Sequence, residues 1–279
     1  MLGNASIDTT LRVPRLPVPG ETLMADGILR SPGGKGFNQA VVASRCGVAV
    51  RFLAPLGGEP ETAIIRDAVR EMEARFVDIG EASDLSTLLV GPDGENCIVS
   101  TGACAFGLGV AAAEAFVADM VAGDVLLMQG NLSLEVTLAA ARLAPFVVLN
   151  TAPVRWDYSG LLPLCAVVVA NAGEALEITG LRDPSEAARA LAVGGVGVVT
   201  LGAAGCVLAA PDPVVLPAER VPVVDTTGAG DVFCGVLAAG LVLGRSIGEA
   251  VAAGQRAAGI AVGRAGCYPA FPTRGELKG

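Results

Sequence analysis

An aspartate at the end of a glycine-rich turn, Asp231, is the residue best placed to do chemistry in this sequence. It closes the string Asp225-Thr226-Thr227-Gly228-Ala229-Gly230-Asp231, here called the aspartate string. The string lies between an apolar run, Val221 to Val224, and an uncharged apolar segment, Val232 to Leu243. This pattern predicts a strand, a turn and the start of a helix. Free backbone amides and the helix dipole attract an anion to such a turn, so the string predicts a phosphate site.

A carboxylate at the positive end of a helix indicates acid–base chemistry on a phosphoryl acceptor. Asp231 would take a proton from an attacking hydroxyl. The amides of Gly228, Ala229 and Gly230 would hold the charge that develops on the phosphoryl oxygens. In the alternative interpretation, Asp231 only caps the helix and the glycines only turn the chain. The full string favours phosphoryl transfer over capping.

A second glycine-rich string, Gly33-Gly34-Lys35-Gly36-Phe37-Asn38-Gln39-Ala40, lies about 190 residues before the first and is here called the lysine string. The two strings together resemble the two signatures of the phosphofructokinase-B (PfkB), or ribokinase, family of carbohydrate and nucleoside kinases. The lysine string takes the form that ribokinases carry. The similarity runs from Gly3 to about Leu277. The resemblance therefore implies an ATP-dependent carbohydrate kinase.

The resemblance also implies a sugar site of short carboxylates and amides, which suit vicinal hydroxyls because they accept or donate in pairs. Without it, Asp8 would be interpreted as a turn residue and Asn38 as a surface helix residue. Two positions depart from the family: Ser6 stands where ribokinases carry Asn, and Gly130-Asn131 stands where they carry Glu. The sequence therefore predicts a kinase, but it does not predict ribose as the substrate. The implied sugar-site residues are Ser6, Asp8, Gly34, Lys35, Asn38, Asn131 and Asp231.

Sites for ATP and Mg²⁺ follow from the same resemblance. The nucleotide would lie over the Thr200 to Gly205 turn, where small residues let the backbone approach phosphates, with Gln255 beside the adenine. Asn171 and Glu174 have the spacing of the family's N-x-x-E element, which organises Mg²⁺ through its water shell. The alternative for this pair is an ordinary helix start. The implied nucleotide residues are Asn171, Thr200, Gly202, Gly205, Gly230 and Gln255.

A loop for a monovalent cation is implied beside the aspartate string, because backbone carbonyls can coordinate K⁺ there. The resemblance implies activation by K⁺. Ala270 stands where ribokinases carry Ser, so a weaker or differently closed cation site is expected. In the family's arrangement, the loop contains Asp225, Thr227, Ala261, Arg264 and Gly266.

The composition excludes several kinds of site and partner. The chain has 279 residues, enough for one large α/β domain, and a net charge of −9. It lacks the basic surface that nucleic acids and anionic membranes require. The absence of histidine excludes Ser-His-Asp and Cys-His catalysis and disfavours catalytic zinc. Seven cysteines without a C-x-x-C pair indicate a reduced, cytoplasmic protein.

The start of the chain and one uncharged apolar stretch bear on targeting and membrane insertion. No basic segment followed by an apolar one opens the chain, so no signal peptide is expected. Met1-Leu2-Gly3 resembles the middle of the family's first strand, which would end at Asp8, and the natural start is therefore expected upstream. The 22 uncharged residues from Ala190 to Pro211 could span a bilayer, but their five glycines favour two buried strands and a turn.

The order of elements predicts an α/β fold with a doubly wound, mostly parallel sheet flanked by helices. Ligands bind at the carboxyl ends of the strands in such sheets, where Gln129, Asn131, Asn150 and Asn171 are expected. Helical patterns cover 36–46, 59–74, 111–121, 134–144, 173–179 and 185–192, and strand patterns cover 125–128, 146–150, 166–170 and 196–201.

Two segments outside that alternation resemble the small β-sheet lid that the family places over its sugar. Strand patterns within residues 7–31, at 7–13 and 21–31, and within residues 86–101 would form it, the second range as a hairpin around residues 91–95. The lid would be inserted in a single domain of residues 1–279. Apparent edge strands at Ile7–Val13 and Ser86–Thr101 would be open to aggregation, which predicts a homodimer through the lid.

Three functions remain open. The leading hypothesis is an ATP-dependent kinase for a hydroxyl of a pentose or hexose. A nucleoside kinase of the same family is the runner-up, with Phe37 as a platform for the base. A non-catalytic sugar or nucleotide sensor is the third, since a fold does not guarantee a function. The retained Asp231 and its three glycine-turn neighbours favour an enzyme.

Overall fold

The computed structural model describes residues 1–92, 96–210 and 212–278. Its largest sheet has the strand order β12-β11-β10-β9-β8-β7. Strands β7 to β10 run parallel to one another, whereas β11 and β12 pair antiparallel with their neighbours. These strands are β7 Leu126–Gln129, β8 Val147–Asn150, β9 Val167–Asn171, β10 Val196–Thr200, β11 Cys206–Ala209 and β12 Pro213–Leu216.

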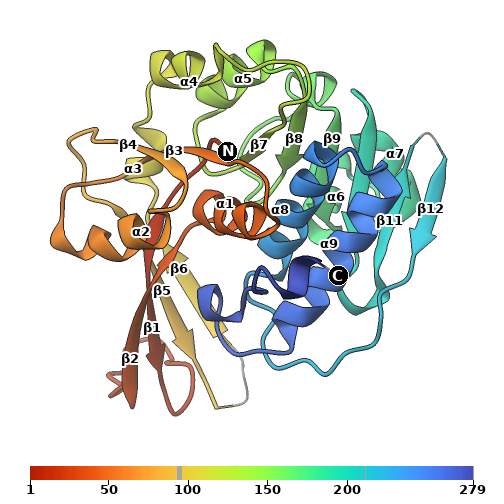
Figure 1. The fold of residues 1–279 in the computed structure, drawn as a ribbon. Helices are drawn as coiled ribbons and strands as arrows, with labels where there is room; N and C mark the ends of the chain where they lie inside the picture. The colour runs from red at the N-terminus through yellow and green to blue at the C-terminus, as the bar shows by residue number, and fades with distance from the viewer. Residues whose placement is uncertain (93–95, 211, 279) are drawn as a thin grey trace.

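Helices cover both faces of this sheet (Figure 1). Neighbouring strand residues point to opposite faces: Val148 packs with α1, α8 and α9, and Leu149 packs with α4 to α7. Burial on both faces explains why these strands are continuous apolar runs. The α-helices are α1 Lys35–Arg45, α2 Ala63–Ala68, α3 Ala103–Phe106, α4 Val110–Val117, α5 Leu134–Leu143, α6 Ala172–Thr179, α7 Pro184–Leu191, α8 Ala229–Val242 and α9 Ile247–Val262. Short 3₁₀ helices are η1 Pro60–Thr62, η2 Leu162–Leu164, η3 Gly202–Ala204, η4 Tyr268–Ala270 and η5 Glu276–Lys278.

The first three residues join the large sheet to a parallel pair, β3 (Arg51–Pro55) and β4 (Glu73–Val77). The amide of Leu2 donates to the carbonyl of Leu127 in β7 at 3.2 Å, and the amide of Gly3 donates to the carbonyl of Leu53 in β3 at 3.1 Å. The chain therefore crosses the middle of the molecule before it enters the lid.

A second sheet of four strands has the order β2-β1-β5-β6 and projects from one end of the molecule (Figure 1). β1 lies between β2 and β5, so the edges of this lid sheet are β2 and β6. The expectation that residues 7–13 form an edge strand is therefore wrong. The lid strands are β1 Ser6–Arg12, β2 Gly27–Gly33, β5 Asp84–Val90 and β6 Asn96–Ser100.

The structure confirms the α/β fold and most of the predicted elements, and it corrects four of them. Residues 221–224 form no strand, because Pro222 lacks an amide proton and the segment lies exposed on the surface. The helix predicted over 59–74 ends at Ala68, and β4 begins at Glu73. The strand predicted from Glu21 begins only at Gly27. The strand expected to end near Asp8 instead starts at Ser6.

Two further expectations concern particular segments. Part of the predicted hairpin turn, residues 93–95, lies outside the described residues, although β5 and β6 pair antiparallel as expected. The uncharged stretch 190–211 contains β10 and β11, joined by a turn, as predicted. Within the part of the chain that the structure describes, no helix has the length and apolarity needed to span a bilayer.

Candidate active site

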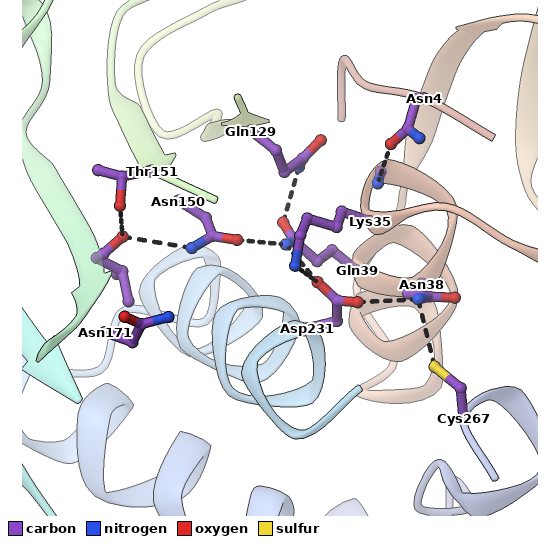
Figure 2. A network of polar contacts seen from close by, with 12 residues as sticks. Asn4, Lys35, Asn38, Gln39, Gln129, Asn150, Thr151, Asn171, Asp231 and Cys267 are labelled. Atoms are coloured by element: carbon purple, nitrogen blue, oxygen red, sulfur yellow. Dashed lines mark hydrogen bonds and ion pairs between the residues drawn. The ribbon is translucent and has the colours of Figure 1, made fainter. Parts of the chain in front are cut away.

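The N-termini of α1 and α8 meet beside the carboxyl ends of β7, β8 and β9. α1 starts within the lysine string and α8 starts within the aspartate string, and the two helices pack against each other. This packing places Asn38 within hydrogen-bond distance of Asp231, although 193 residues separate them in the chain. Figure 2 shows the network of polar side chains that surrounds Asp231.

Asp231 is 4% exposed, and both of its carboxylate oxygens accept hydrogen bonds. Oδ2 accepts from Nδ2 of Asn38 at 2.8 Å, and Oδ1 accepts from Nε2 of Gln39 at 2.9 Å. Nζ of Lys35 lies 3.9 Å from Oδ1. The Asp231 carboxylate raises the pKa of Lys35 above its ordinary value, because it stabilises the ammonium ion. A buried carboxylate with two amide donors and a nearby cation has the partners that its charge requires.

The aspartate string forms the open start of α8. Gly228 is its N-cap, with φ of 80°, and no side chain caps this helix. The amides of Gly228 and Gly230 have no partner among the described residues, whereas the amide of Ala229 donates to the carbonyl of Thr226 at 3.3 Å. Two of the three amides expected to bind an anion are therefore free, and the third is engaged in the turn.

Only glycine fits at position 228. Its positive φ is strained for residues with a side chain, and an added Cβ would lie 2.6 Å from Sγ of Cys267. Sγ of Cys267 also accepts a hydrogen bond from Nδ2 of Asn38 at 3.5 Å, at the edge of the network (Figure 2).

Asp8, in lid strand β1, lies at the same site. Oγ of Ser6 donates to its Oδ1 at 3.0 Å, so the Ser6 hydroxyl holds Asp8 in place. Burial raises the pKa of Asp8 to about 6, hydrogen bonds from Ser6 and Ser86 oppose the rise, and the charge of Asp231 adds to it. The two carboxylates thus lie close enough for the charge of Asp231 to act on Asp8.

Three buried amide oxygens have no hydrogen-bond partner among the described residues. They are Oδ1 of Asn38, Oδ1 of Asn131 and Oε1 of Gln129. An unsatisfied buried acceptor costs roughly 1–3 kcal/mol, so a ligand that donates to it gains affinity. The lid-side glycine of the lysine string, Gly34, has φ of 93°, and an added Cβ would meet the backbone of Ala5 and Ser6. The structure therefore brings together six of the seven predicted sugar residues, whereas Asn131 lies in the turn after β7; the six are Ser6, Asp8, Gly34, Lys35, Asn38 and Asp231.

Asn171 and Glu174 form the capping box of α6. The side chain of Asn171 accepts from the amide of Glu174 at 2.9 Å, and Oε2 of Glu174 accepts from the amide of Asn171 at 3.0 Å. Oγ1 of Thr151 also donates to Oε2 of Glu174 at 3.0 Å. Asn171 and Glu174 therefore do form an ordinary helix start, the alternative that the sequence left open for this pair. Its carboxylate and amide oxygens are also the hard ligands that hydrated Mg²⁺ prefers.

Five of the six residues predicted for the nucleotide lie around the carboxyl end of β10, and the sixth, Gly230, lies in the aspartate string. Thr200 ends β10, and Gly202 and Gly205 follow in a turn with φ of 57° and 100°. Gln255 in α9 lies near this turn, because its Nε2 donates to the carbonyl of Leu216 at 3.1 Å. The same carbonyl would meet a Cβ added to Gly205.

Asp225 ties together the loop predicted for K⁺. Oδ1 accepts from the amide of Thr227 and Oδ2 from the amide of Gly266, each at 2.9 Å. Burial alone would raise the pKa of Asp225, but these hydrogen bonds hold it below its ordinary value. The amide of Arg264 donates to the carbonyl of Ala261 at 3.0 Å, while the Arg264 side chain pairs with a distant glutamate. The predicted members of the loop therefore lie in two chain segments, 225–227 and 261–266, which the hydrogen bond between Asp225 and Gly266 joins.

A family model described as pfkB family carbohydrate kinase matches residues 1–274. The chain belongs to this family. A ribokinase of Haemophilus influenzae is 32% identical, over 99% of this chain and 95% of its own length. A ribokinase structure from Thermotoga maritima is 27% identical, with a TM-score of 0.92, and the match covers 99% of this chain and 96% of that one. An Arabidopsis thaliana ribokinase, solved with ribose and ATP, is 24% identical with a TM-score of 0.84, over 99% and 96% of the two chains.

Family membership makes this protein an ATP-dependent sugar kinase with a ribokinase-like fold. One hypothesis about its site is wrong: Phe37 is fully buried and packs against Tyr268, with ring centroids 5.8 Å apart. It cannot serve this kinase as an exposed platform for a nucleoside base. The Phe37 side chain is instead part of the hydrophobic core.

Sequence reasoning missed Gln39, although it belongs to the lysine string. Gln39 is fully buried, and its Nε2 donates both to Asp231 and to Oδ1 of Asn150, the latter at 3.1 Å. Nε2 of Gln129 donates to Oε1 of Gln39 at 2.7 Å. The available signal was its position next to Asn38, since a helix rotates about 100° per residue and both side chains can flank one neighbour.

Proposed function

We propose that this kinase transfers the γ-phosphate of ATP to a hydroxyl of a pentose or hexose, with Asp231 as the general base. The observation that carries the proposal is the position of Asp231, a buried carboxylate at the uncapped start of α8, beside the free amides of Gly228 and Gly230. A base and an anion site within one helical turn suit proton removal from the acceptor and charge stabilisation on the phosphoryl group.

The sugar lies between the lid and α1 in this proposal. Asp8 and the unpaired oxygens of Asn38 and Asn131 are acceptors for its hydroxyls, and Lys35 and Gly34 line the same place. Asn131 offers a neutral amide where a carboxylate occurs in ribokinases, and the Ser6 hydroxyl is engaged by Asp8. We therefore infer a pocket whose preferred sugar differs from ribose in its hydroxyl pattern.

ATP extends from the aspartate string to the turn at Thr200, Gly202 and Gly205, with Gln255 near the adenine. The oxygens of Asn171 and Glu174 would hold Mg²⁺ through water, and the metal would neutralise charge on the phosphates. No cluster of three acidic or thiol ligands occurs in residues 1–92, 96–210 and 212–278, which suits a metal carried mainly by the nucleotide. K⁺ would bind in the loop of Asp225, Thr227, Ala261, Arg264 and Gly266.

Two features concern the setting in which the kinase works. Apolar side chains on lid strands are exposed, including Ile28 at 63%, Ile98 at 50% and Val99 at 68%, which supports a homodimer formed through the lid. All seven cysteines are free thiols, which supports a reducing, cytoplasmic environment.

The proposal is tested by ADP release from Mg-ATP and K⁺ over a panel of pentoses, hexoses, sugar acids and nucleosides. Wild type and Asp231→Asn are compared, because the amide is isosteric with the carboxylate but is no base. Turnover of a sugar that falls by at least roughly 1,000-fold in the variant supports the mechanism. Equal turnover by the two proteins contradicts it, and turnover of nucleosides alone favours the other branch of the family.

A further inference from the structure

Gln39 contacts the proposed base and has no part in the mechanism so far. It lies on α1 directly after Asn38 and is fully buried. We propose that Gln39 is a positioning residue, which orients the Asp231 carboxylate toward the acceptor hydroxyl through a directed chain of side-chain amides. This inference rests on the proposed role of Asp231.

The direction of the chain is set by a backbone carbonyl. The carbonyl of Val169 in β9 can only accept, so the group 3.3 Å away must be the Nδ2 of Asn150. Oδ1 of Asn150 is then turned toward Gln39 and accepts from its Nε2 at 3.1 Å. The same Nε2 is thereby aimed at Oδ1 of Asp231, 2.9 Å away. Figure 2 shows this sequence of contacts running from Asn150 to Asp231.

Gln129 supports Gln39 from the opposite end. Its Nε2 donates to Oε1 of Gln39 at 2.7 Å, and this oxygen could not accept if the Gln39 amide were flipped. Gln39 therefore has one amide orientation, which contacts on both of its polar atoms specify. These contacts come from β7 and β8, so the central sheet itself fixes the donor to Asp231.

Two donors on different oxygens define the plane of the Asp231 carboxylate. Asn38 holds Oδ2 and Gln39 holds Oδ1, so rotation of the carboxylate breaks both hydrogen bonds. Asn38 also has an unpaired oxygen for the ligand, whereas the polar atoms of Gln39 all face protein. Gln39 therefore acts on the orientation of the base and Asn38 on both base and ligand, and catalysis is sensitive to such alignment.

Loss of Gln39 should change turnover more than binding. In Gln39→Met, which keeps the length of the side chain but has no donor, we expect kcat to fall between roughly 10-fold and 100-fold. KM for sugar and for ATP should stay within about 3-fold of wild type. The matched control is Thr137→Val, which removes a buried hydrogen bond to the Ser133 carbonyl in α5 and should leave kcat unchanged. Melting temperature and ATP binding confirm that each variant is folded.

A second variant separates orientation from packing. Gln39→Glu has the same shape, but its ionised carboxylate cannot donate and repels Asp231. Its protonated form regains one donor, so the ratio of variant to wild-type kcat should rise as the pH falls from 8 to 5.5. Other ionisable groups face the site in both proteins, and the wild-type pH profile reports their titration; they are Lys35 on α1, Asp8 on β1, Glu174 on α6, Cys234 on α8 and Cys267 near the C-terminus.

The kinetic assays use the panel sugars with Mg-ATP, D-ribose first. If Asp231→Asn is inactive and Gln39→Met has wild-type kcat, the positioning role fails while the proposed base stands. If Asp231→Asn is active, the proposed function fails.

An NMR measurement tests the contact without any turnover. The side-chain amide protons of Gln39, identified by their loss in Gln39→Met, should shift upfield and exchange faster in Asp231→Ala. Their insensitivity to Asp231→Ala would overturn the inference.

Discussion

Nδ2 of Asn38 lies 2.8 Å from Oδ2 of Asp231, and Oδ1 of Asn38 is buried without a partner among the described residues. One amide thus holds the proposed base and offers its oxygen to a ligand. Asn38→Asp keeps the shape but replaces the donor with a second carboxylate, which repels Asp231 at short range. We expect kcat/KM for the sugar to fall at least roughly 100-fold, with KM for ATP within about 3-fold of wild type. Wild-type kcat/KM for the sugar would contradict this role.

Asp8 should reduce the stability of the protein while it serves the site. Its pKa is raised by burial from 3.8 to about 6, so the ionised form is disfavoured in the folded state. The contribution of protonated Asp8 to the free energy of unfolding is complete at low pH, and it is lost as the pH rises through 6. At pH 8 the cost is roughly 3 kcal/mol, at about 1.4 kcal/mol for each pH unit.

Asp8→Asn should therefore raise the free energy of unfolding by about 1–3 kcal/mol at pH 8, and the gain should shrink as the pH falls toward 4. The same variant should lose at least roughly 100-fold in kcat/KM for the sugar, because the carboxylate acceptor is gone. Urea unfolding at several pH values measures the first effect. The control is Asp26→Asn, at an exposed position before β2. A stability gain equal at pH 5 and pH 8 would point to a cause other than ionisation.

Gly228 should be irreplaceable for two separable reasons. Gly228→Ala meets both a positive φ and a contact of 2.6 Å with Sγ of Cys267. Gly244 has φ of 75° with no atom near an added Cβ, so Gly244→Ala isolates the conformational part, about 1–2 kcal/mol.

We expect Gly228→Ala to destabilise more than Gly244→Ala and to lower kcat by at least roughly 10-fold, since the anion-binding amides move. Gly244→Ala should keep wild-type kcat. Thermal unfolding and the ADP-release assay measure both quantities. Equal stability losses in the two variants would show that the contact with Cys267 relaxes without cost.

K⁺ should stimulate the wild type through the loop that Asp225 ties together. Asp225→Ala removes the acceptor for the amides of Thr227 and Gly266, so the loop loses its geometry. We expect turnover to rise when K⁺ replaces tetramethylammonium in the wild type, and to be insensitive to this exchange in Asp225→Ala. A wild-type enzyme indifferent to K⁺ would show that the resemblance does not extend to this cation.

The lid should form the subunit interface. Val99 lies in edge strand β6 and is 68% exposed, and Val215 lies in β12 at the edge of the large sheet and is 60% exposed. A buried charge is costly, so Val99→Glu should convert a dimer of 27.9 kDa chains into monomers, while Val215→Glu should leave the dimer intact. Light scattering after gel filtration gives the masses. A monomeric wild type, or dissociation caused equally by the two substitutions, would contradict a lid interface.

Local sequence patterns were enough to predict the elements with strong signals. The aspartate string predicted the start of α8, because glycine conformations and a free helix N-terminus are properties of neighbouring residues. Continuous apolar runs predicted β7 to β10, since burial on both faces needs no knowledge of the partner. The family resemblance added residues such as Asn38 and Asp8, whose types alone would not have distinguished them from surface residues.

Which side chains meet depends on how the helices and strands pack together. Residues 221–224 have the composition of a strand but form none, because a strand needs a neighbour with free backbone groups. Phe37 and Gln39 lie on either side of Asn38, yet the first faces the core and the second faces Asp231. The packing of α1 against α8 makes that choice, and it joins residues nearly 200 positions apart. Such contacts depend on the relative placement of whole elements, which no local pattern in the sequence specifies.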